Sequence, residues 1–334
     1  MVKQVTSFDV ARRAGVSQPT VSRALRNLPG ASAETRDRVL AAAAELSYIP
    51  SESGRSLSLR STRRIAVVSE ELTNPYYPEL VEPLRRELAR HDLRTVLITQ
   101  TEHGPVGLDV LADGSYDGVL LTTTVRNSSL PRDLTERGIP HVLVNRTLDR
   151  AESHSCAMDN AGGARAIADL LVSSGHSRIA TVQGPVATST GKERSDALRA
   201  RLRGHGVRVP RAWTLRSGFS HDAGFAAVIP LLQSADRPTA VVCGNDVIAL
   251  GVLSAARSLG ITVPDQLTVI GFDDIPLAGW PLVALTTVRC DLTALATVAV
   301  QLLLAAQQDS ASAPVERRIP VSLVLRDTHG PPVT

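Results

Sequence analysis

The chain has 334 residues, enough for two or three domains with a sizeable core, and its 43% hydrophobic content is typical of a globular α/β protein. No apolar run approaches the roughly 18 residues of a membrane span, and the N-terminal stretch lacks the apolar core and cleavage site of a secretory signal. The three cysteines are odd in number and far apart, which favours reduced thiols and a cytoplasmic location over a disulfide framework.

The charge is unevenly distributed along the chain. Residues 1–60 contain nine Lys and Arg against five Asp and Glu, a net charge of +4, while the remainder contains 27 against 28, a net charge of −1. A basic module on a near-neutral body indicates a polyanionic partner, although a solvated basic surface would give the same count.

The first elements are two short helices. Thr6 followed by Asp9 resembles a capping box, and Gly15 is expected to end the helix that begins there. Ser17 is a suitable N-cap for the next helix, and Pro19 falls in its first turn, where its missing N–H costs nothing. The apolar side of the first helix is expected to comprise Phe8, Val10, Ala11 and Ala14.

A third helix is predicted over residues 33–47, capped by Ser32. Its apolar positions are Val39, Leu40, Ala43 and Leu46. Three short helices with a glycine-containing turn between the first two indicate a helix-turn-helix domain.

Beyond a Ser- and Arg-rich linker, strand and helix patterns alternate. The strand patterns are IAVVSEEL, RTVLITQ, DGVLLTTT, PHVLVNR, RIATVQG, TAVVCGND and LTVIGFDD, and the helical ones include YPELVEPLRRELARHD and AGGARAIADLLVSSG. Continuous apolar strands between helices predict parallel sheets covered on both faces, and the number of units predicts two similar lobes. Ligands of such sheets bind beyond the carboxyl ends of the strands, which here end in polar residues.

Several enzyme signatures are absent from the sequence. No G-x-G-x-x-G follows a strand, no G-x-S-x-G occurs, and a phosphate-binding loop would need glycine and Ser/Thr where Val186 and Glu193 stand. Ser220, His221 and Asp222 are consecutive and are not expected to converge as a triad. His154 and Cys156 are too few ligands for zinc. We therefore expect no enzyme activity, no cofactor and no metal.

The motifs together carry a family likeness. VTSFDVARRAGVSQPTVSRALRN, SAETRDRVLAAAAELSYIP, NPYYPELV, VLVNR, DNAGGARAIADLL, GHSRIATVQGP, TGKER, GND, VPDQLTVIGFDD, LTTVR and LVLRD occur in order and resemble the lactose/galactose repressor (LacI/GalR) family over essentially the whole chain. The resemblance implies an α/β fold with an N-terminal three-helix helix-turn-helix headpiece and a two-lobed body of the periplasmic-binding-protein type I form, with doubly wound parallel sheets.

The resemblance also implies domain boundaries. It assigns residues 1–47 to the DNA-binding domain, 48–63 to a hinge and 64–334 to the effector-binding and dimerisation domain. Within the body, it assigns the N-lobe to residues 64–158 and 289–319 and the C-lobe to residues 159–288 and 320–334.

If the second helix enters the major groove, residues near its N-terminus face the base edges. By resemblance, Gln18 and Pro19 match the family's principal specificity pair and Arg23 a base-contact position; otherwise they are merely exposed residues. Thr20 and Ser22 are expected to contact phosphates. The full expected DNA-binding set is Thr6, Ser17, Gln18, Pro19, Thr20, Ser22, Arg23, Asn27 and Leu57.

Leu57 matches the hinge leucine that family members insert into the minor groove, the alternative being that it packs on the body. Gly54 stands where the family usually has alanine, which costs roughly 1 kcal/mol of helix propensity. We expect this hinge to fold only on DNA.

The resemblance places a small-molecule pocket between the lobes, lined by Tyr76, Asn145, Thr188, Thr190, Arg194, Phe219, Asn245 and Asp273. Alternatively, Asp273 is a turn residue and Phe219 is plain core. Thr188 replaces an arginine of the purine-responsive member, which disfavours a purine. Cys290 replaces a polar residue of some sugar-responsive members, so the identity of a sugar stays open. The chain before DGSYDGV is also short, so one lobe helix is expected to be reduced.

The expected partners are a palindromic double-stranded DNA operator, a carbohydrate-like effector and a second copy of the chain, with no membrane. The segment YPELVEPLRREL is a candidate dimer surface, and no leucine heptads follow at the C-terminus. We expect a ligand-controlled transcriptional regulator, most often a repressor in this family. The alternatives are a cytoplasmic enzyme of similar form and a ligand-binding protein that does not use its head on DNA.

Overall fold

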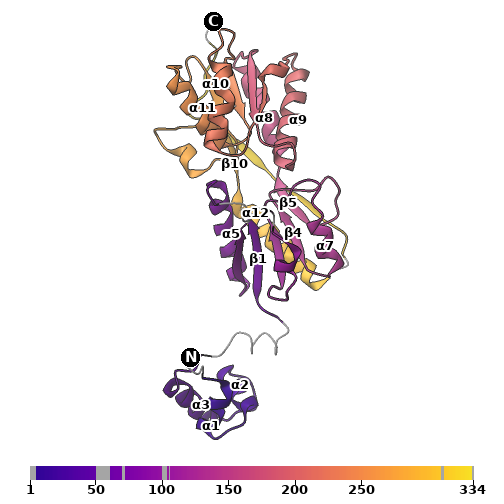
Figure 1. Ribbon diagram of the computed structural model, residues 1–334, viewed down its shortest axis with the longest axis vertical. Coiled ribbons are helices and arrows are strands. Elements are labelled where there is room, and N and C mark those ends of the chain that lie inside the picture. The colour runs from indigo at the N-terminus through magenta and orange to yellow at the C-terminus, as the bar shows by residue number, and fades with distance from the viewer. Residues whose placement is uncertain are drawn as a thin grey trace. The chain divides into compact units, whose positions relative to one another are not determined.

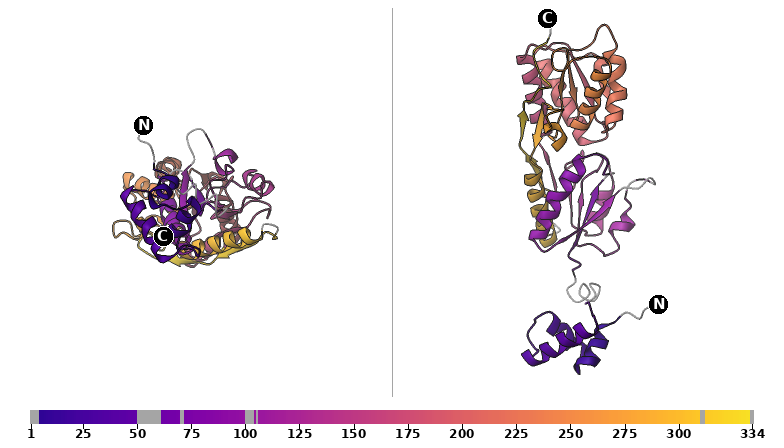
Figure 2. Two further views of the ribbon diagram at one scale, coloured as in Figure 1. Left: turned by 90° about the horizontal axis from the view of Figure 1, so that it is seen from below. Right: turned by 90° about the vertical axis from the view of Figure 1, so that its left-hand side faces the viewer.

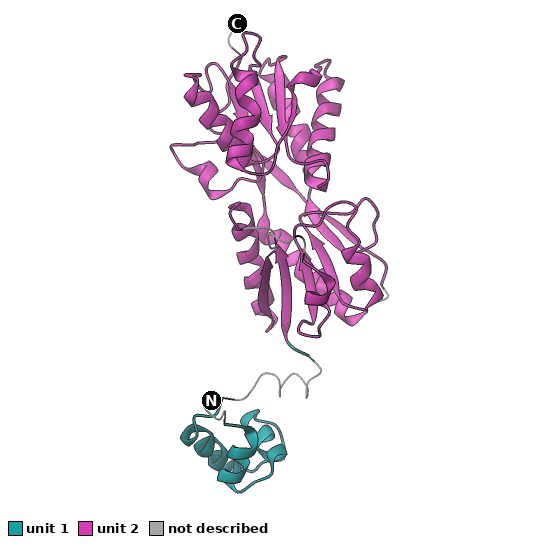
Figure 3. Cartoon of the chain, viewed as in Figure 1, with its two compact units in different colours: residues 1–62 teal, residues 63–334 magenta. Residues whose placement is uncertain are grey.

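The computed structural model describes residues 5–49, 61–69, 72–99, 104, 106–309 and 312–332. The chain forms two compact units, Met1–Thr62 and Arg63–Thr334, each with its own core (Figure 3). Leu57 and Gly54, which the sequence analysis assigned to the hinge, lie outside the described residues.

The N-terminal unit contains three helices, α1 (Ser7–Ala14), α2 (Gln18–Leu25) and α3 (Ala33–Glu45). The predicted capping box is confirmed, because the backbone N–H of Asp9 donates to the Thr6 hydroxyl and the Asp9 carboxylate accepts from the Thr6 N–H. Gly15 ends α1 at a φ of 67°, a conformation that glycine adopts without strain. The core is formed around Val10, Val21 and Val39, which are fully buried.

Three local predictions for this unit need correction. The helix α3 ends at Glu45 rather than at residue 47, where Ser47 turns to a φ of 47°. Ser17 is the N-cap residue of α2, but its hydroxyl bonds the Thr20 hydroxyl and caps no backbone N–H. Phe8 and Leu40 are 69% and 47% exposed, since successive helical residues point about 100° apart and the core already faces the valines.

The body begins with a six-stranded parallel sheet. Its strand order is β11 (Glu316–Ile319), β5 (Ser155–Met158), β4 (His141–Val144), β3 (Gly118–Leu121), β1 (Arg64–Ser69) and β2 (Arg94–Thr99). Helices α5 (Tyr76–Arg90) and α12 (Leu292–Gln308) pack together on one face, while α6 (Leu108–Leu111) and α7 (Leu130–Glu136) cover the other (Figure 1). With four residues, α6 is the reduced helix that the short segment predicted.

A second parallel sheet has the order β7 (Thr214–Arg216), β6 (Ile179–Gln183), β8 (Ala240–Cys243) and β9 (Thr268–Ile270). Helices α8 (Asn160–Ser173) and α9 (Ser189–Gly204) cover one face, and α10 (His221–Leu232) and α11 (Asp246–Ser258) the other (Figure 2). Two short 3₁₀ helices are Arg211–Trp213 and Pro276–Gly279. The expected two lobes of parallel sheet with helices on both faces are therefore present.

We call the lobe of the six-stranded sheet the N-lobe and that of the four-stranded sheet the C-lobe. The chain passes between them after β5, after β10 (Thr287–Cys290), and between β11 and β12 (Val321–Val324). Strands β10 and β12 pair antiparallel and form a ribbon at these crossovers. All seven apolar strand patterns read from the sequence are strands in the structure. The strands that were not predicted, β5, β7, β10, β11 and β12, are three or four residues long, and several of them are polar.

Candidate functional site

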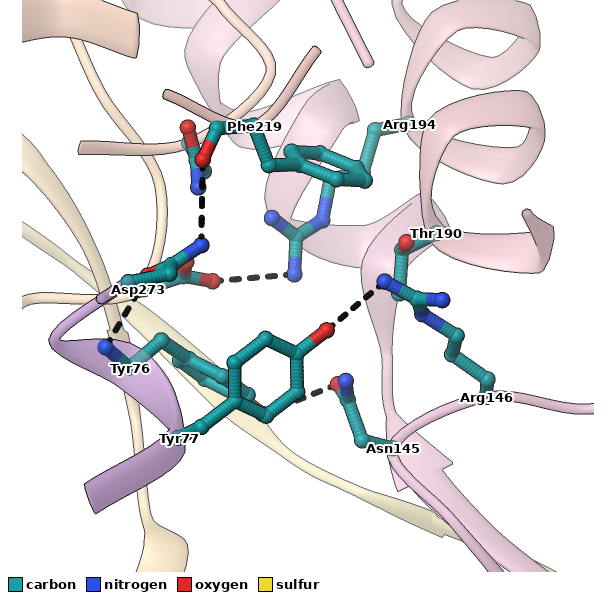
Figure 4. A pocket seen from close by; sticks show the side chains of 10 residues that line it. Tyr76, Tyr77, Asn145, Arg146, Thr190, Arg194, Phe219 and Asp273 are labelled. Atoms are coloured by element: carbon teal, nitrogen blue, oxygen red, sulfur yellow. Dashed lines mark hydrogen bonds and ion pairs between the residues drawn. The ribbon is translucent and has the colours of Figure 1, made fainter. Parts of the chain in front are cut away.

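One pocket lies where the carboxyl ends of strands from both lobes meet (Figure 4). The N-lobe contributes residues that follow β1 and β4, and the C-lobe contributes residues that follow β6, β7, β8 and β9. The lining residues are Asn74, Tyr76, Tyr77, Asn145, Arg146, Thr190, Arg194, Phe219, Asn245 and Asp273.

Local chain geometry places several of these groups. Asn245 is the N-cap of α11, where its side-chain oxygen accepts from the Ile248 N–H. Asn145 and Asp273 have φ angles of 70° and 121°, in the left-handed region that non-glycine residues seldom adopt. Such backbone conformations concentrate at functional sites, because tertiary structure must hold them in place.

The centre of the pocket is a buried ion pair. An Nη of Arg194 lies 3.0 Å from a carboxylate oxygen of Asp273, and both side chains are 5% exposed. Arg194 also donates to the side-chain oxygen of Asn160 at 2.8 Å and to the Gly244 carbonyl at 2.8 Å. Its guanidinium stacks 3.7 Å above the Phe272 ring. The guanidinium is therefore held in one orientation with one edge toward the pocket.

Burial affects the carboxyl group of the pair and a second carboxyl group behind it, that of Asp246. Burial raises the pKa of Asp273 to about 6, and the positive charge of Arg194 opposes that shift. Burial and the neighbouring Asp273 raise the pKa of Asp246 to about 7. Asp246 does not line the pocket; it accepts hydrogen bonds from the Ile275 N–H and the Thr287 hydroxyl.

Two tyrosines present hydroxyls from the start of α5. The Tyr76 hydroxyl donates to the side-chain oxygen of Asn145 at 2.8 Å, and burial raises the pKa of Tyr76 well above its usual range. Arg146 donates to the Tyr77 hydroxyl at 2.7 Å and to the Thr123 carbonyl, and its guanidinium lies 5.8 Å from the Phe219 ring centroid. Amide, guanidinium, carboxylate and hydroxyl groups thus surround aromatic faces.

The lobes touch around this pocket. The Asn74 side chain donates to the Phe219 carbonyl, and the Thr147 N–H donates to the Ser189 hydroxyl at 2.9 Å. Arg126 reaches from the N-lobe to the Val186 carbonyl at 3.0 Å while Asp149 holds its guanidinium. The cavity volume is about 20 Å³, which accommodates about one water molecule.

Seven of the eight residues assigned to the effector pocket by resemblance come together here. Thr188 does not line it, because its hydroxyl donates to the Pro185 carbonyl and accepts from the Gly191 N–H at the start of α9. Asn74, Tyr77 and Arg146 also line the pocket and were not predicted from the sequence. Asn74 and Tyr77 lie within two residues of Tyr76, and Arg146 directly follows Asn145. Their position next to predicted pocket residues, just beyond strand ends, was the signal that could have found them.

The second helix of the N-terminal unit presents a polar surface. Ser17, Pro19, Arg23 and Asn27 are exposed, while Gln18, Thr20 and Ser22 are half-buried. Val21 and Ala24 face the core. The amide of Gln18 donates to the Ser7 hydroxyl at 3.3 Å, and Thr6 caps α1. Of the DNA-binding set, only Leu57 falls outside the described residues.

A second cavity, of about 740 Å³, lies on the C-lobe beside α11 and the loop after Gly279. There His221 contacts the Ser254 hydroxyl and the Asp222 carboxylate at 2.9 and 2.8 Å, a Ser-His-Asp chain that includes a serine from another helix. Ser254 lies within α11, where backbone N–H groups bond inside the helix, and the Asp222 side chain is 98% exposed. In the described helix, the backbone N–H groups around Ser254 are therefore engaged inside α11 and do not face the hydroxyl as an oxyanion site would require.

The described residues also bear on metal binding and on membrane insertion. They contain no group of three or more His, Cys, Asp and Glu side chains that could hold a metal ion. Within the same ranges, every helix is too short or too polar to cross a membrane.

Family models match both units of the chain. Residues 8–51 match the bacterial regulatory proteins of the lacI family, and residues 168–329 match the periplasmic binding protein-like domain. The HTH-type transcriptional repressor PurR of Escherichia coli O139:H28 is 32% identical over 305 residues, which cover 90% of this chain and 89% of PurR.

Solved structures extend the likeness to the whole fold. The transcriptional regulator CelR–cellobiose complex has a TM-score of 0.74 at 30% identity, covering 97% of this chain and 100% of CelR. The Lac repressor dimer bound to operator and the anti-inducer ONPF has a TM-score of 0.85 at 26% identity, covering 98% and 99% of the two chains. The chain belongs to the lacI family of bacterial regulatory proteins and is a DNA-binding transcriptional regulator with a periplasmic-binding-protein-like effector domain.

Proposed function

We propose that this regulator is a repressor that binds a palindromic operator as a homodimer in the cytoplasm and is controlled by a carbohydrate-like molecule between its lobes. The observation that carries the proposal is the pocket itself. Oriented groups from both lobes, centred on Arg194 and Asp273, converge at the carboxyl ends of parallel strands. Regulation, rather than catalysis, is the use that this arrangement supports.

The chemistry of the lining favours a polyhydroxylated ligand. Asn145, Asn245 and Asp273 offer amide and carboxylate groups to hydroxyls, while Phe219 and Tyr76 offer faces to the apolar side of a sugar ring. CelR, a similar protein, has been solved with cellobiose. Because ligand pockets usually measure roughly 300–1,000 Å³, the side chains and lobes around the 20 Å³ cavity must separate to admit a sugar.

The exposed side of α2 supports DNA reading. Arg23 is free to form two hydrogen bonds to a guanine edge, and Pro19 can offer only apolar contact, for instance to a thymine methyl. Gln18 must exchange its bond to Ser7 for one to a base. Thr6, Ser17, Thr20, Ser22 and Asn27 serve as neighbouring DNA contacts, and Leu57 enters the minor groove.

Two exposed surfaces support dimerisation. The outward side of α5 carries Glu82, which pairs with Arg85 and Arg86. On the C-lobe, Leu282 is 98% exposed and Trp280 is 55% exposed beside the 740 Å³ cavity. About a two-fold axis, the exposed Leu282 region of each copy can pack into the groove of the other. The same two-fold symmetry matches that of a palindromic operator.

Selection of bound duplexes from a random pool tests the DNA proposal. We expect a palindromic consensus whose binding weakens steeply with salt, because phosphate contacts release counterions. If no duplex is retained at low salt, the operator proposal is wrong.

A thermal-shift screen tests the effector. Cellobiose, lactose, monosaccharides and purine bases should be compared, with Asp273→Asn as the matched variant that removes a pocket acceptor. A sugar should raise the melting temperature of the parent by more than that of the variant. If only purine bases raise the melting temperature, the carbohydrate proposal is wrong and the effector is a purine.

Analytical ultracentrifugation tests the dimer. Leu282→Asp should weaken self-association, while Val110→Asp should leave it unchanged, because this 44% exposed valine lies in α6, away from the cavity and on the opposite face of the N-lobe sheet from α5. Unchanged sedimentation of the Leu282→Asp variant would remove the C-lobe face from the interface.

A further inference from the structure

The pocket ion pair is connected to all three crossovers between the lobes through residues that do not line the pocket. We propose that Glu193 and Asp274 are positioning residues that join the Arg194–Asp273 pair to the crossover strands and so set the angle between the lobes. The inference rests on the proposed function and deepens it, because it identifies how the effector site is linked to the crossover strands between the lobes.

The first connection starts beside Arg194. Asn160 is 1% exposed and lies directly after the crossover from β5; its side-chain oxygen accepts from Arg194 and its amide donates to Glu193 at 3.0 Å. Glu193 in turn binds both terminal nitrogens of Arg318, at 2.7 and 2.9 Å. Arg318 belongs to β11, at the edge of the N-lobe sheet, whereas Glu193 belongs to the C-lobe helix α9.

This first connection therefore runs without a gap from the pocket across the lobe boundary. A two-pronged arginine–carboxylate contact is directional, so Glu193 transmits a rotation of α9 to β11 better than a single contact would. Arg318 also approaches the Met158 carbonyl at 3.4 Å, on the strand that leads into Asn160.

The second connection starts beside Asp273. Asp274 also has a positive φ, 57°, and its side chain is 8% exposed. Its two carboxylate oxygens accept from Arg289 and from Arg326, each at 2.6 Å. Arg289 lies in β10, and Arg326 follows β12, so the carboxylate joins both strands of the crossover ribbon.

Backbone contacts tighten this second connection. The N–H of Asp273 donates to the Val288 carbonyl at 2.9 Å, and the Cys290 N–H donates to the Asp273 carbonyl. The buried Asp246 carboxylate holds the Ile275 N–H and the Thr287 hydroxyl. Two successive residues in left-handed conformations are thus fixed so that one carboxylate faces the pocket and the next faces the ribbon.

The two connections share one plan. In each, a charged pocket residue is adjacent in sequence to a carboxylate that binds an arginine of a crossover strand. A ligand that draws Arg194 or Asp273 toward itself must move Glu193 or Asp274 as well, and with them the strands whose bend defines lobe closure. Packed, discrete contacts of this kind convert small shifts into rigid-body motion.

Pulsed electron paramagnetic resonance on the full-length protein tests the proposal. Spin labels at Glu136→Cys on the N-lobe and Arg203→Cys on the C-lobe report the distance between lobes; both positions are exposed, and the three native cysteines are buried. Asp274→Asn and Glu193→Gln should each shift or broaden the distance distribution. Asp169→Asn is the matched control, because its contact with Arg201 joins α8 and α9 within one lobe and should leave the distribution unchanged.

Three further comparisons separate positioning from stability. Amide exchange in β10 should accelerate about tenfold in Asp274→Asn, the loss expected for charge-assisted hydrogen bonds, but not in the control. Asp273→Asn should shift the distances in the same direction, and the Asp273→Asn/Asp274→Asn double variant should shift them by less than the sum. If Glu193→Gln fails to fold, Arg318→Lys keeps the charge and removes the two-pronged contact.

Unchanged distances in these variants, whatever their melting temperatures, would overturn the proposal and leave both carboxylates with a purely structural role. Neither measurement uses DNA or an effector. The failure of the operator selection or of the sugar screen is therefore distinguishable from the failure of this inference.

Discussion

The helix-turn-helix surface and the effector pocket use polar residues in opposite environments. In α2, Pro19 and Arg23 are exposed and come from one short helix, whereas Arg194 and Asp273 are buried and come from positions 79 residues apart. Substituting an exposed polar residue leaves no unpaired charge in the protein interior, whereas substituting one member of a buried ion pair leaves the other charge buried and uncompensated. Substitutions in the head should therefore alter recognition, and those in the pocket should alter recognition and stability together.

The largest expected effect comes from breaking the buried pair. Arg194→Met leaves the Asp273 carboxylate without its cation and should lower the free energy of unfolding of the body by about 3–5 kcal/mol. Urea titration followed by the fluorescence of the two tryptophans, Trp213 and Trp280, reports this unit alone. Arg201→Met, which breaks an exposed pair with Asp169, should cost below about 1 kcal/mol. Equal losses in the two variants would contradict the comparison.

The pH dependence should differ between the units. Asp246 and Asp273 have folded pKa values of about 7 and about 6, above the ordinary 3.8, so the folded body retains protons that the unfolded chain releases. Stability from these groups is therefore present below about pH 4 and is lost as the pH rises through 6 and 7, by up to about 1.4 kcal/mol per pH unit for each carboxyl. The described N-terminal residues include no buried carboxylate.

Urea titrations between pH 4.5 and 7.5 measure this slope for the body. Asp246→Asn removes one of the two titrating groups and should flatten the slope. A slope that is identical in the parent and the variant would show that Asp246 does not contribute.

In the head, Arg23→Ala should weaken binding to the selected operator by about 1–3 kcal/mol and relax the base preference at one position. Its melting transition should not change, because the side chain is exposed. Fluorescence anisotropy with the consensus and single-base variants measures both effects. Arg38→Ala, at an exposed position in α3, is the control for simple loss of charge. Uniform weakening across all sequences would assign Arg23 to a phosphate instead.

The smallest expected effect concerns the hinge. Gly54→Ala should tighten operator binding by about 1 kcal/mol if, as we expect from the family resemblance, this segment folds into a helix on DNA, because alanine has the higher helix propensity. The same anisotropy titration measures it. Unchanged or weaker binding would argue against a hinge helix at this position.

Local physics made much of this molecule readable from its sequence. The Thr6–Asp9 capping box, the Gly15 stop and the continuous apolar strands depend on neighbours within a few residues, and all were predicted. The basic head and the polar strand ends likewise pointed to a polyanion and to a pocket at one edge of each sheet. Short polar strands such as β11 gave no signal, because the sequence ERRI contains no continuous apolar run.

Tertiary structure decided which of these residues meet. Sequence order could not show that Arg194 would face Asp273, that Thr188 would turn away to cap α9, or that His221 would reach Ser254 rather than Ser220. It also could not reveal that Glu193 and Asp274 face the crossover strands. A hydrogen bond within a helix turn depends on the adjacent residues alone, whereas a contact between lobes depends on where two separately folded sheets bring their strand ends.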